Sequence, residues 1–92
     1  MPVKLTWLGH SCFSLVASGH RLIVDPFLDQ NDAAPVKAAA VEADYILVTH
    51  GHFDHISDAA PIAKRTGATV LANFEVTQWL AKQGVAQDKL VA

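Results

Sequence analysis

The chain has 92 residues, 51% of them hydrophobic and 17% charged, with a formal net charge of −2 and a single cysteine, Cys12. This length fits one small domain over residues 1–92, and the weak negative charge provides no basic surface for nucleic acid or for an anionic membrane. The absence of a signal-peptide pattern, of an apolar run of about 20 residues and of a cysteine pair together predict a cytoplasmic protein without a disulfide or a membrane span.

The first quarter of the chain alternates apolar and polar residues, which is typical of β-strands. We predict strands over residues 3–8, 11–17 and 21–24. Ser18, Gly19 and His20 form a hairpin signal, because glycine readily adopts the positive φ of a tight turn. Pro26 lacks the N–H needed to continue a strand. The amino-terminal part is therefore predicted to be an antiparallel meander.

The remainder of the chain alternates short apolar runs with helical patterns, which predicts parallel strand pairing. We predict, in chain order, a loop at 29–35, a short alanine-rich helix at 36–41, a strand at 45–48, a helix at 58–66, a strand at 69–72, a helix at 75–83 and a strand at 89–92. Asp58 is the predicted N-cap of its helix, and Gly67 and Gly84 are the predicted stops. Cys12 is interpreted as a small buried hydrophobic residue, and Trp79 as part of a packing stripe.

The stretch Thr49-His50-Gly51-His52-Phe53-Asp54-His55 holds three of the five histidines of the chain. It follows an apolar predicted strand and precedes a predicted helix, the place where open α/β sheets bind their ligands. Imidazoles and a carboxylate are ligands that zinc and similar divalent metals accept. The spacing suggests one metal held partly by His50 and His52, and a neighbouring metal held partly by Asp54 and His55.

This motif resembles the metal-binding signature of the metallo-β-lactamase superfamily. Three further stretches, at residues 7–13, 23–28 and 43–50, resemble the uncharacterised metal-dependent hydrolases related to ascorbate-6-phosphate lactonase. The resemblance covers essentially the whole chain but only the first part of that family's fold, an αββα sandwich of two similar halves. It implies the amino-terminal part of such a sandwich: an antiparallel meander followed by a β-α-β-α unit in a mixed sheet.

The resemblance also implies a function, the hydrolysis of a small-molecule lactone, ester or phosphoester by a metal-bound hydroxide. Two zinc ions are the expected cofactors, with manganese or iron as alternatives. Asp54 is both a metal ligand and the candidate for handling a proton. Asp25 either orients the metal loop or is a turn carboxylate before proline, and His10 either touches substrate or makes a structural hydrogen bond.

A complete site of this family needs two more histidines and a bridging carboxylate, yet no histidine follows His55. At most two protein ligands per metal are therefore present, where a catalytic zinc normally has three. Three interpretations stay open. The chain is part of a hydrolase that a complementary chain or a longer parent protein completes, or a homo-oligomer that buries its apolar sheet face and binds metal weakly, or a truncated and non-catalytic product.

Overall fold

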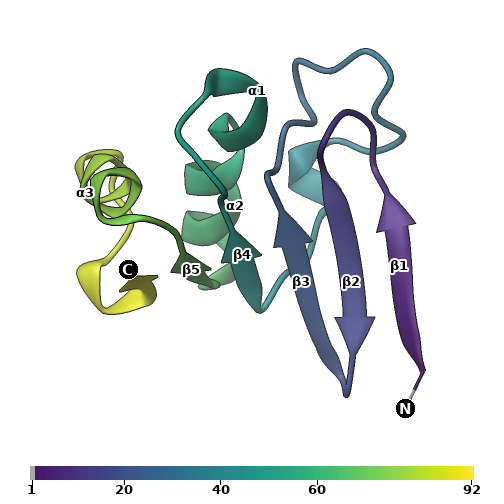
Figure 1. The fold of residues 1–92 in the computed structure, drawn as a ribbon, viewed down its shortest axis with the longest axis horizontal. Helices are drawn as coiled ribbons and strands as arrows, with labels where there is room; N and C mark the ends of the chain where they lie inside the picture. Colours follow the sequence, from purple (N-terminus) through teal and green to yellow (C-terminus); the bar gives the residue numbers. More distant parts are fainter. Residues whose placement is uncertain (1) are drawn as a thin grey trace.

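The computed structural model describes residues 2–92, which form a six-stranded mixed sheet with helices (Figure 1). The strands lie in the sheet in chain order: β1 (Val3–Trp7), β2 (Phe13–Ala17), β3 (His20–Val24), β4 (Tyr45–Leu47), β5 (Thr69–Leu71) and β6 (Leu90–Val91). The first three strands pair in antiparallel fashion, and β3 to β6 pair in parallel. The predicted α/β fold with a mixed sheet is confirmed.

The turn between β2 and β3 fixes the register of the meander. Ala17 pairs with His20, so Ser18 and Gly19 are the two loop residues, and both have positive φ angles, 52° and 78°. Two consecutive positive φ angles define the tight hairpin turn whose twist matches that of the flanking strands. Leu15 consequently pairs with Leu5 on one side and with Leu22 on the other.

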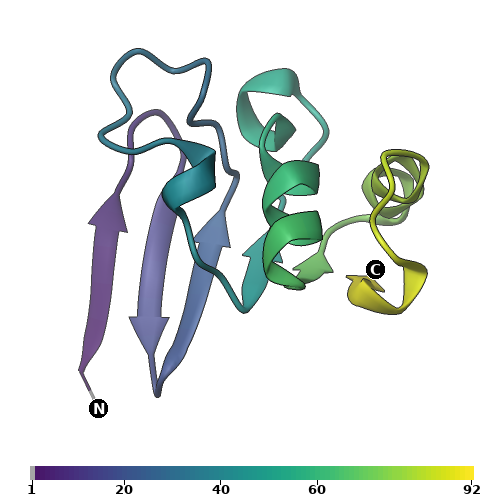
Figure 2. The same ribbon diagram turned by 180° about the vertical axis from the view of Figure 1, so that it is seen from behind.

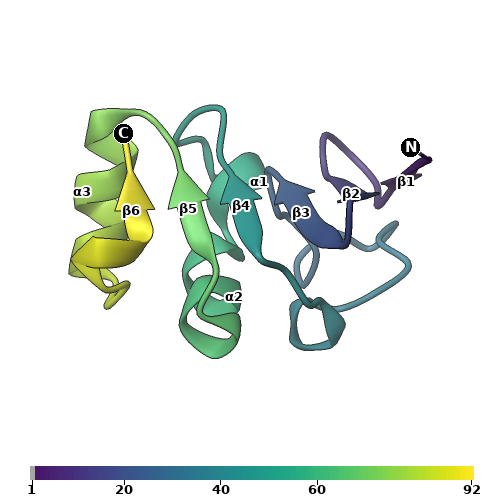
Figure 3. The same ribbon diagram turned by 90° about the horizontal axis from the view of Figure 1, so that it is seen from below.

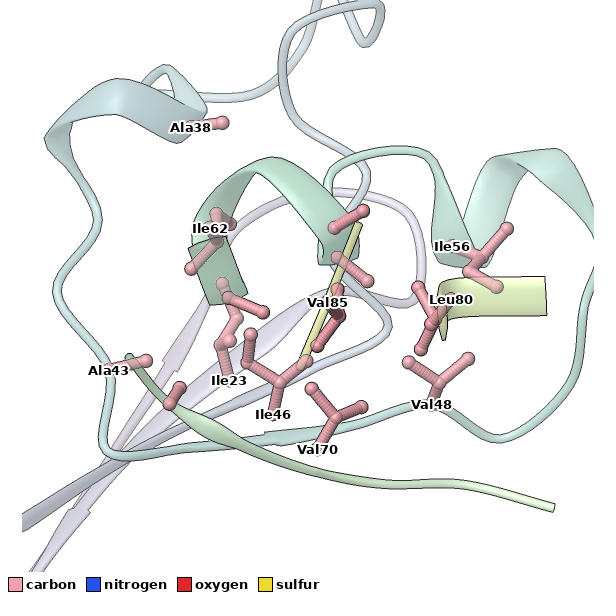
Figure 4. Close-up of a cluster of buried hydrophobic side chains, with 14 of the residues drawn as sticks. Ile23, Ala38, Ala43, Ile46, Val48, Ile56, Ile62, Val70, Leu80 and Val85 are labelled. Carbon is pink, nitrogen blue, oxygen red and sulfur yellow. The ribbon is translucent and has the colours of Figure 1, made fainter. Parts of the chain in front are cut away.

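The helices are α1 (Phe53–Ile56), α2 (Ala59–Thr66) and α3 (Phe74–Lys82), with short 3-10 turns η1 (Ala38–Ala40) and η2 (Gln87–Lys89). Figure 2 shows α2 packed across one face of the sheet. The core lies between the sheet and the helices. There the sheet residues Ile46 and Val70 meet Ile62 of α2 and Leu80 of α3 (Figure 4), and all four side chains are fully buried. No helix within residues 2–92 is long and apolar enough to cross a membrane.

Three sequence predictions need correction. The helix expected over residues 36–41 is only the 3-10 turn Ala38–Ala40, and the helical structure after β4 begins at Phe53, inside the metal motif, as the separate turn α1. Lys89 belongs to η2, so the last strand is shorter than predicted.

Asp58 occupies the predicted N-cap position of α2, but its side chain makes no capping hydrogen bond. Its buried carboxylate instead accepts hydrogen bonds from the backbone N–H groups of Leu28, at 2.6 Å, and Asp29, at 3.1 Å. The side-chain cap of the following helix is provided by Asn73, which accepts from the N–H of Val76 at 2.8 Å. Asp58 therefore holds the loop after β3 against α2.

The opposite face of the sheet is apolar and uncovered. Figure 3 shows α2 and η1 on the same side of the sheet. On the other side, Val3, Leu5 and Trp7 of β1 are 58%, 61% and 63% exposed. An apolar depression of about 340 Å³ lies farther along this face, lined by Ala17, His20, Leu22, Tyr45, Leu47 and Leu71. Most monomeric proteins expose apolar residues singly. Here the exposed apolar residues form a patch on one face of the sheet.

Candidate metal centre

The candidate site lies at one edge of the sheet, where three chain segments leave strands that point in the same direction (Figure 1). His10 follows β1, Asp25 follows β3, and the metal motif follows β4. Because β3 and β4 are parallel neighbours, Asp25 and Thr49 arrive side by side. The topology thus brings together residues that are far apart in the sequence.

Asp25 is the buried centre of the site, with an exposed fraction of 3%. Its carboxylate accepts three hydrogen bonds: from the backbone N–H of Thr49 at 2.7 Å, from the Thr49 hydroxyl at 2.7 Å, and from Nδ1 of His55 at 2.8 Å. Its backbone has a positive φ of 48°, which aspartate tolerates better than most residues. Through these contacts, Asp25 ties the end of β3 to the segment that follows β4.

The three histidines of the motif gather around this network. The ring centroids of His50 and His52 lie 4.7 Å apart, and those of His50 and His55 lie 4.1 Å apart. Nδ1 of His55 is hydrogen-bonded to Asp25, and its other ring nitrogen, Nε2, lies 3.7 Å from Oδ1 of Asp54. A histidine held in this way by a carboxylate presents its second nitrogen to a metal.

His10 and Asp54 form a half-exposed pair at the outer side of the site. Nε2 of His10 lies 2.9 Å from Oδ2 of Asp54, and the rings of His10 and His55 are 5.2 Å apart. Desolvation raises the pKa of Asp54, but the hydrogen bond with His10 and the electrostatic influence of the His55 and His10 side chains outweigh it, so that this pKa lies below its ordinary value. Asp54 is therefore ionised at neutral pH, as a metal ligand must be.

Two groups of side chains in residues 2–92 have ligand atoms close enough together for one metal ion. One comprises His10, Asp54 and His55, and the other comprises Asp25, His50 and His55, with all ligand atoms within 4.8 Å of one another in each group. The atoms Asp25 Oδ2 and His55 Nδ1 already share a hydrogen bond. The donor set of imidazoles and carboxylates fits zinc and similar divalent ions.

These two groups contain five of the six residues expected at the site, and the structure adds one more. His52 belongs to neither group; it is exposed, and its ring lies beside that of His50. His10 reaches Asp54 across 44 positions of sequence, and Asp25 reaches His55 across 30. Thr49, to which the sequence analysis gave no role, lies between Asp25 and His50 and bonds to both. In the sequence, the signal for this contact was a hydroxyl residue directly before the first histidine of the motif.

Other chemically active residues lie away from the cluster or are shielded. Burial raises the pKa of the Cys12 thiol to about 11, although a backbone hydrogen bond to Phe27 lowers it. This fits the interpretation of Cys12 as a buried, unreactive residue. The ring of His20 packs edge-on against Tyr45 at a centroid distance of 5.9 Å, next to the hairpin turn. Trp79, interpreted from the sequence as part of a packing stripe, is instead 43% exposed, and with Gly51 and Glu75 it lines a groove of about 310 Å³ beside α3.

Comparisons with known proteins agree with this geometry. Residues 4–89 match the family described as the beta-lactamase superfamily domain. The chain is 51% identical over 86 residues to a UPF0173 metal-dependent hydrolase of Methylacidiphilum infernorum, covering 92% of this chain and 38% of that protein. A similar hydrolase of Thermoplasma volcanium is 48% identical over 85 residues.

Solved structures show the same similarity. Igni18, a metallo hydrolase from the archaeon Ignicoccus hospitalis, superposes with a TM-score of 0.78 at 33% identity, covering 90% of this chain and 37% of that one. A metal-dependent hydrolase from Parabacteroides distasonis gives a TM-score of 0.69 at 26% identity, over 86% of this chain and 34% of that one. The chain thus spans less than two fifths of the length of these relatives. It belongs to the metallo-β-lactamase superfamily and contains part of that fold.

Proposed function

We propose that this chain contributes the amino-terminal half of the metal centre of a metal-dependent hydrolase that acts on a small-molecule lactone, ester or phosphoester. The observation that carries the proposal is the cluster formed by His50, His55 and Asp54 beside the buried carboxylate of Asp25, with His52 next to His50. The resemblance of the chain to proteins named metal-dependent hydrolases supports it.

In this proposal, His50 and His52 hold one divalent ion, and Asp54 and His55 hold a second. Zinc is the first choice for both ions, with manganese or iron as alternatives. Such ions lower the pKa of bound water toward neutrality and polarise the oxygen under attack. Asp25 holds His55 in place through Nδ1 of its ring. Asp54 is partly exposed to solvent and can hold or release a proton.

His10 has the role of holding Asp54 and meeting substrate at the open side of the site. Its Nε2 is engaged with Asp54, and its ring packs edge-on against Phe27 at 5.7 Å and His55 at 5.2 Å. Its side chain remains 42% exposed, so a substrate bound over the metals would touch it.

His52→Ala tests the metal assignment. We expect the variant to bind zinc at least about tenfold more weakly than the unchanged chain, because a ligand is lost from a site that has few. Metal content after dialysis and zinc affinity by competition with a chelator measure this loss. Hydrolysis of nitrophenyl ester and phosphodiester probes measures its effect on activity.

His20→Ala is the matched control, since His20 is an exposed histidine that packs on Tyr45 beside the hairpin. It should leave zinc binding unchanged. Equal metal content and equal hydrolysis in His52→Ala and in the unchanged chain would overturn the assignment. Zinc binding without hydrolysis in the unchanged chain would favour the alternative of a non-catalytic fragment.

We further propose that another polypeptide surface covers the apolar face of the sheet, on a complementary chain or on a second copy of this one. The exposed strand β1 and the apolar depression support this, as does the greater length of the relatives. A face of this kind is costly to leave in water, since each Å² of apolar surface buried contributes about 25 cal/mol.

Leu5→Glu tests this surface. Native mass spectrometry of the unchanged chain should show a homo-oligomer, or a heteromer when it is purified from its source, and the variant should be monomeric because a buried charge would oppose association. Val16→Glu is the control: Val16 is also exposed, at 40%, but lies on the opposite face of the sheet, beside Lys4. A monomeric unchanged chain would contradict the proposal.

A further inference from the structure

We propose that Thr49 determines which nitrogen of His50 is free to bind a metal, and that Thr49 is thus a positioning residue of the site. The inference deepens the proposed function, because it takes a metal as the partner of His50. The position of the proton on the His50 ring does not depend on a bound metal.

The Thr49 hydroxyl lies between two polar atoms. Its oxygen is 2.7 Å from Oδ2 of Asp25 and 2.8 Å from Nδ1 of His50. A hydroxyl has one hydrogen to donate and lone pairs to accept, whereas an ionised carboxylate only accepts. Two oxygens at 2.7 Å need a hydrogen between them, so the hydroxyl donates to Asp25.

The direction of that hydrogen bond determines the tautomer of His50. Since the only hydroxyl hydrogen of Thr49 points to Asp25, the contact with Nδ1 of His50 requires the imidazole to donate. A neutral imidazole has one N–H, so Nδ1 carries the proton and Nε2 carries the free lone pair. His50 therefore presents Nε2 as its metal ligand.

The same carboxylate determines the tautomer of His55 directly. Nδ1 of His55 donates to Asp25 at 2.8 Å, which leaves Nε2 of His55 free in the same way. One buried carboxylate thus selects the tautomer of two imidazoles, in one case directly and in the other through Thr49. The rings are 4.1 Å apart between centroids, so both selections act within a single cluster.

Backbone contacts hold this arrangement in place without a ligand. The N–H of Thr49 donates to Oδ1 of Asp25 at 2.7 Å, and the N–H of Asp25 donates to the carbonyl of Leu47 at 2.8 Å. Asp25 follows directly on β3, and Thr49 lies two residues beyond the end of its parallel neighbour β4. A ligand shell held by the scaffold in this way is oriented before the metal arrives.

Thr49→Val removes the hydroxyl while keeping the branched shape and the backbone N–H that Asp25 accepts. We expect zinc affinity to fall about tenfold to a hundredfold, the usual effect of losing an orienting partner of a metal-binding histidine. Thr49→Ser, which keeps the hydroxyl, should retain the affinity of the unchanged chain. Thr66→Val is the control, because its hydroxyl donates to the Ile62 carbonyl at 2.7 Å, at the end of α2.

A second readout uses the metal-free chain. Nitrogen-15 NMR of the histidine side chains at about pH 8, where an ordinary imidazole is neutral, reports which ring nitrogen carries the proton. We expect Nδ1–H for His50 in the unchanged chain and in Thr49→Ser, and a mixture or Nε2–H in Thr49→Val.

An Nε2–H tautomer of His50 in the unchanged chain would overturn the inference, even if Thr49→Val failed to fold. Zinc affinity that is equal in Thr49→Val and in the unchanged chain would overturn it as well. If the unchanged chain bound no metal, the proposed function would fail while the NMR result still decided the role of Thr49.

Discussion

Replacing Ile46 by alanine is expected to lower the free energy of unfolding by about 2–5 kcal/mol, the usual cost of truncating a large core residue. Ile46 is fully buried in the middle of β4, paired with Ile23 on one side and Val70 on the other, where the helices cover the sheet (Figure 4). Urea denaturation followed by circular dichroism measures the change.

The loss of stability should be near the upper end of this range. Because helices cover only one face of the sheet, few neighbouring groups can move to fill the cavity left by the truncation. Val16→Ala is the control: Val16 is 40% exposed, so its truncation should change stability by about 0.5 kcal/mol or less. Equal losses for both variants would show that the sheet is not packed as described.

The strands could be predicted well from sequence because their signals are local. Alternation of apolar residues located the meander, and the pair Ser18 and Gly19 located its turn. The helix predicted over residues 36–41 was wrong, since alanine content alone does not nucleate a short helix. Tertiary contacts set that segment instead: Asp29 accepts from the N–H of Ala38, and Arg65 donates to the carbonyls of Ala38 and Val41.

The candidate site could be predicted only in part, for a related reason. Four of its residues lie within six positions, so spacing alone located them. The bond from Asp25 to His55 and that from His10 to Asp54 join segments that the sheet topology brings together. No local pattern encodes such contacts. The role of Thr49 depends on the direction of hydrogen bonds, which becomes visible only when Asp25 is seen beside it.

Replacing Asp25 by asparagine is expected to weaken zinc binding by about tenfold to a hundredfold and to lower stability by about 1–3 kcal/mol. Asparagine keeps the shape and tolerates the positive φ at this position. Its oxygen can still accept from the N–H of Thr49, but its NH₂ group would face the hydroxyl of Thr49 and Nδ1–H of His55. Chelator competition and thermal unfolding measure the two losses.

The arrangement of donors explains why the two effects occur together. With an NH₂ group in place of the carboxylate oxygen, His55 is expected to move its proton to Nε2, the nitrogen that must be free for a metal. Asp44→Asn is the control, because Asp44 also accepts a backbone hydrogen bond, from Arg21 at 2.8 Å, but at the other end of the sheet. Since Asp25 acts on both His55 and, through Thr49, His50, the loss of affinity in Asp25→Asn should exceed that in Thr49→Val. A smaller loss would mean that the two histidines are oriented independently of this carboxylate.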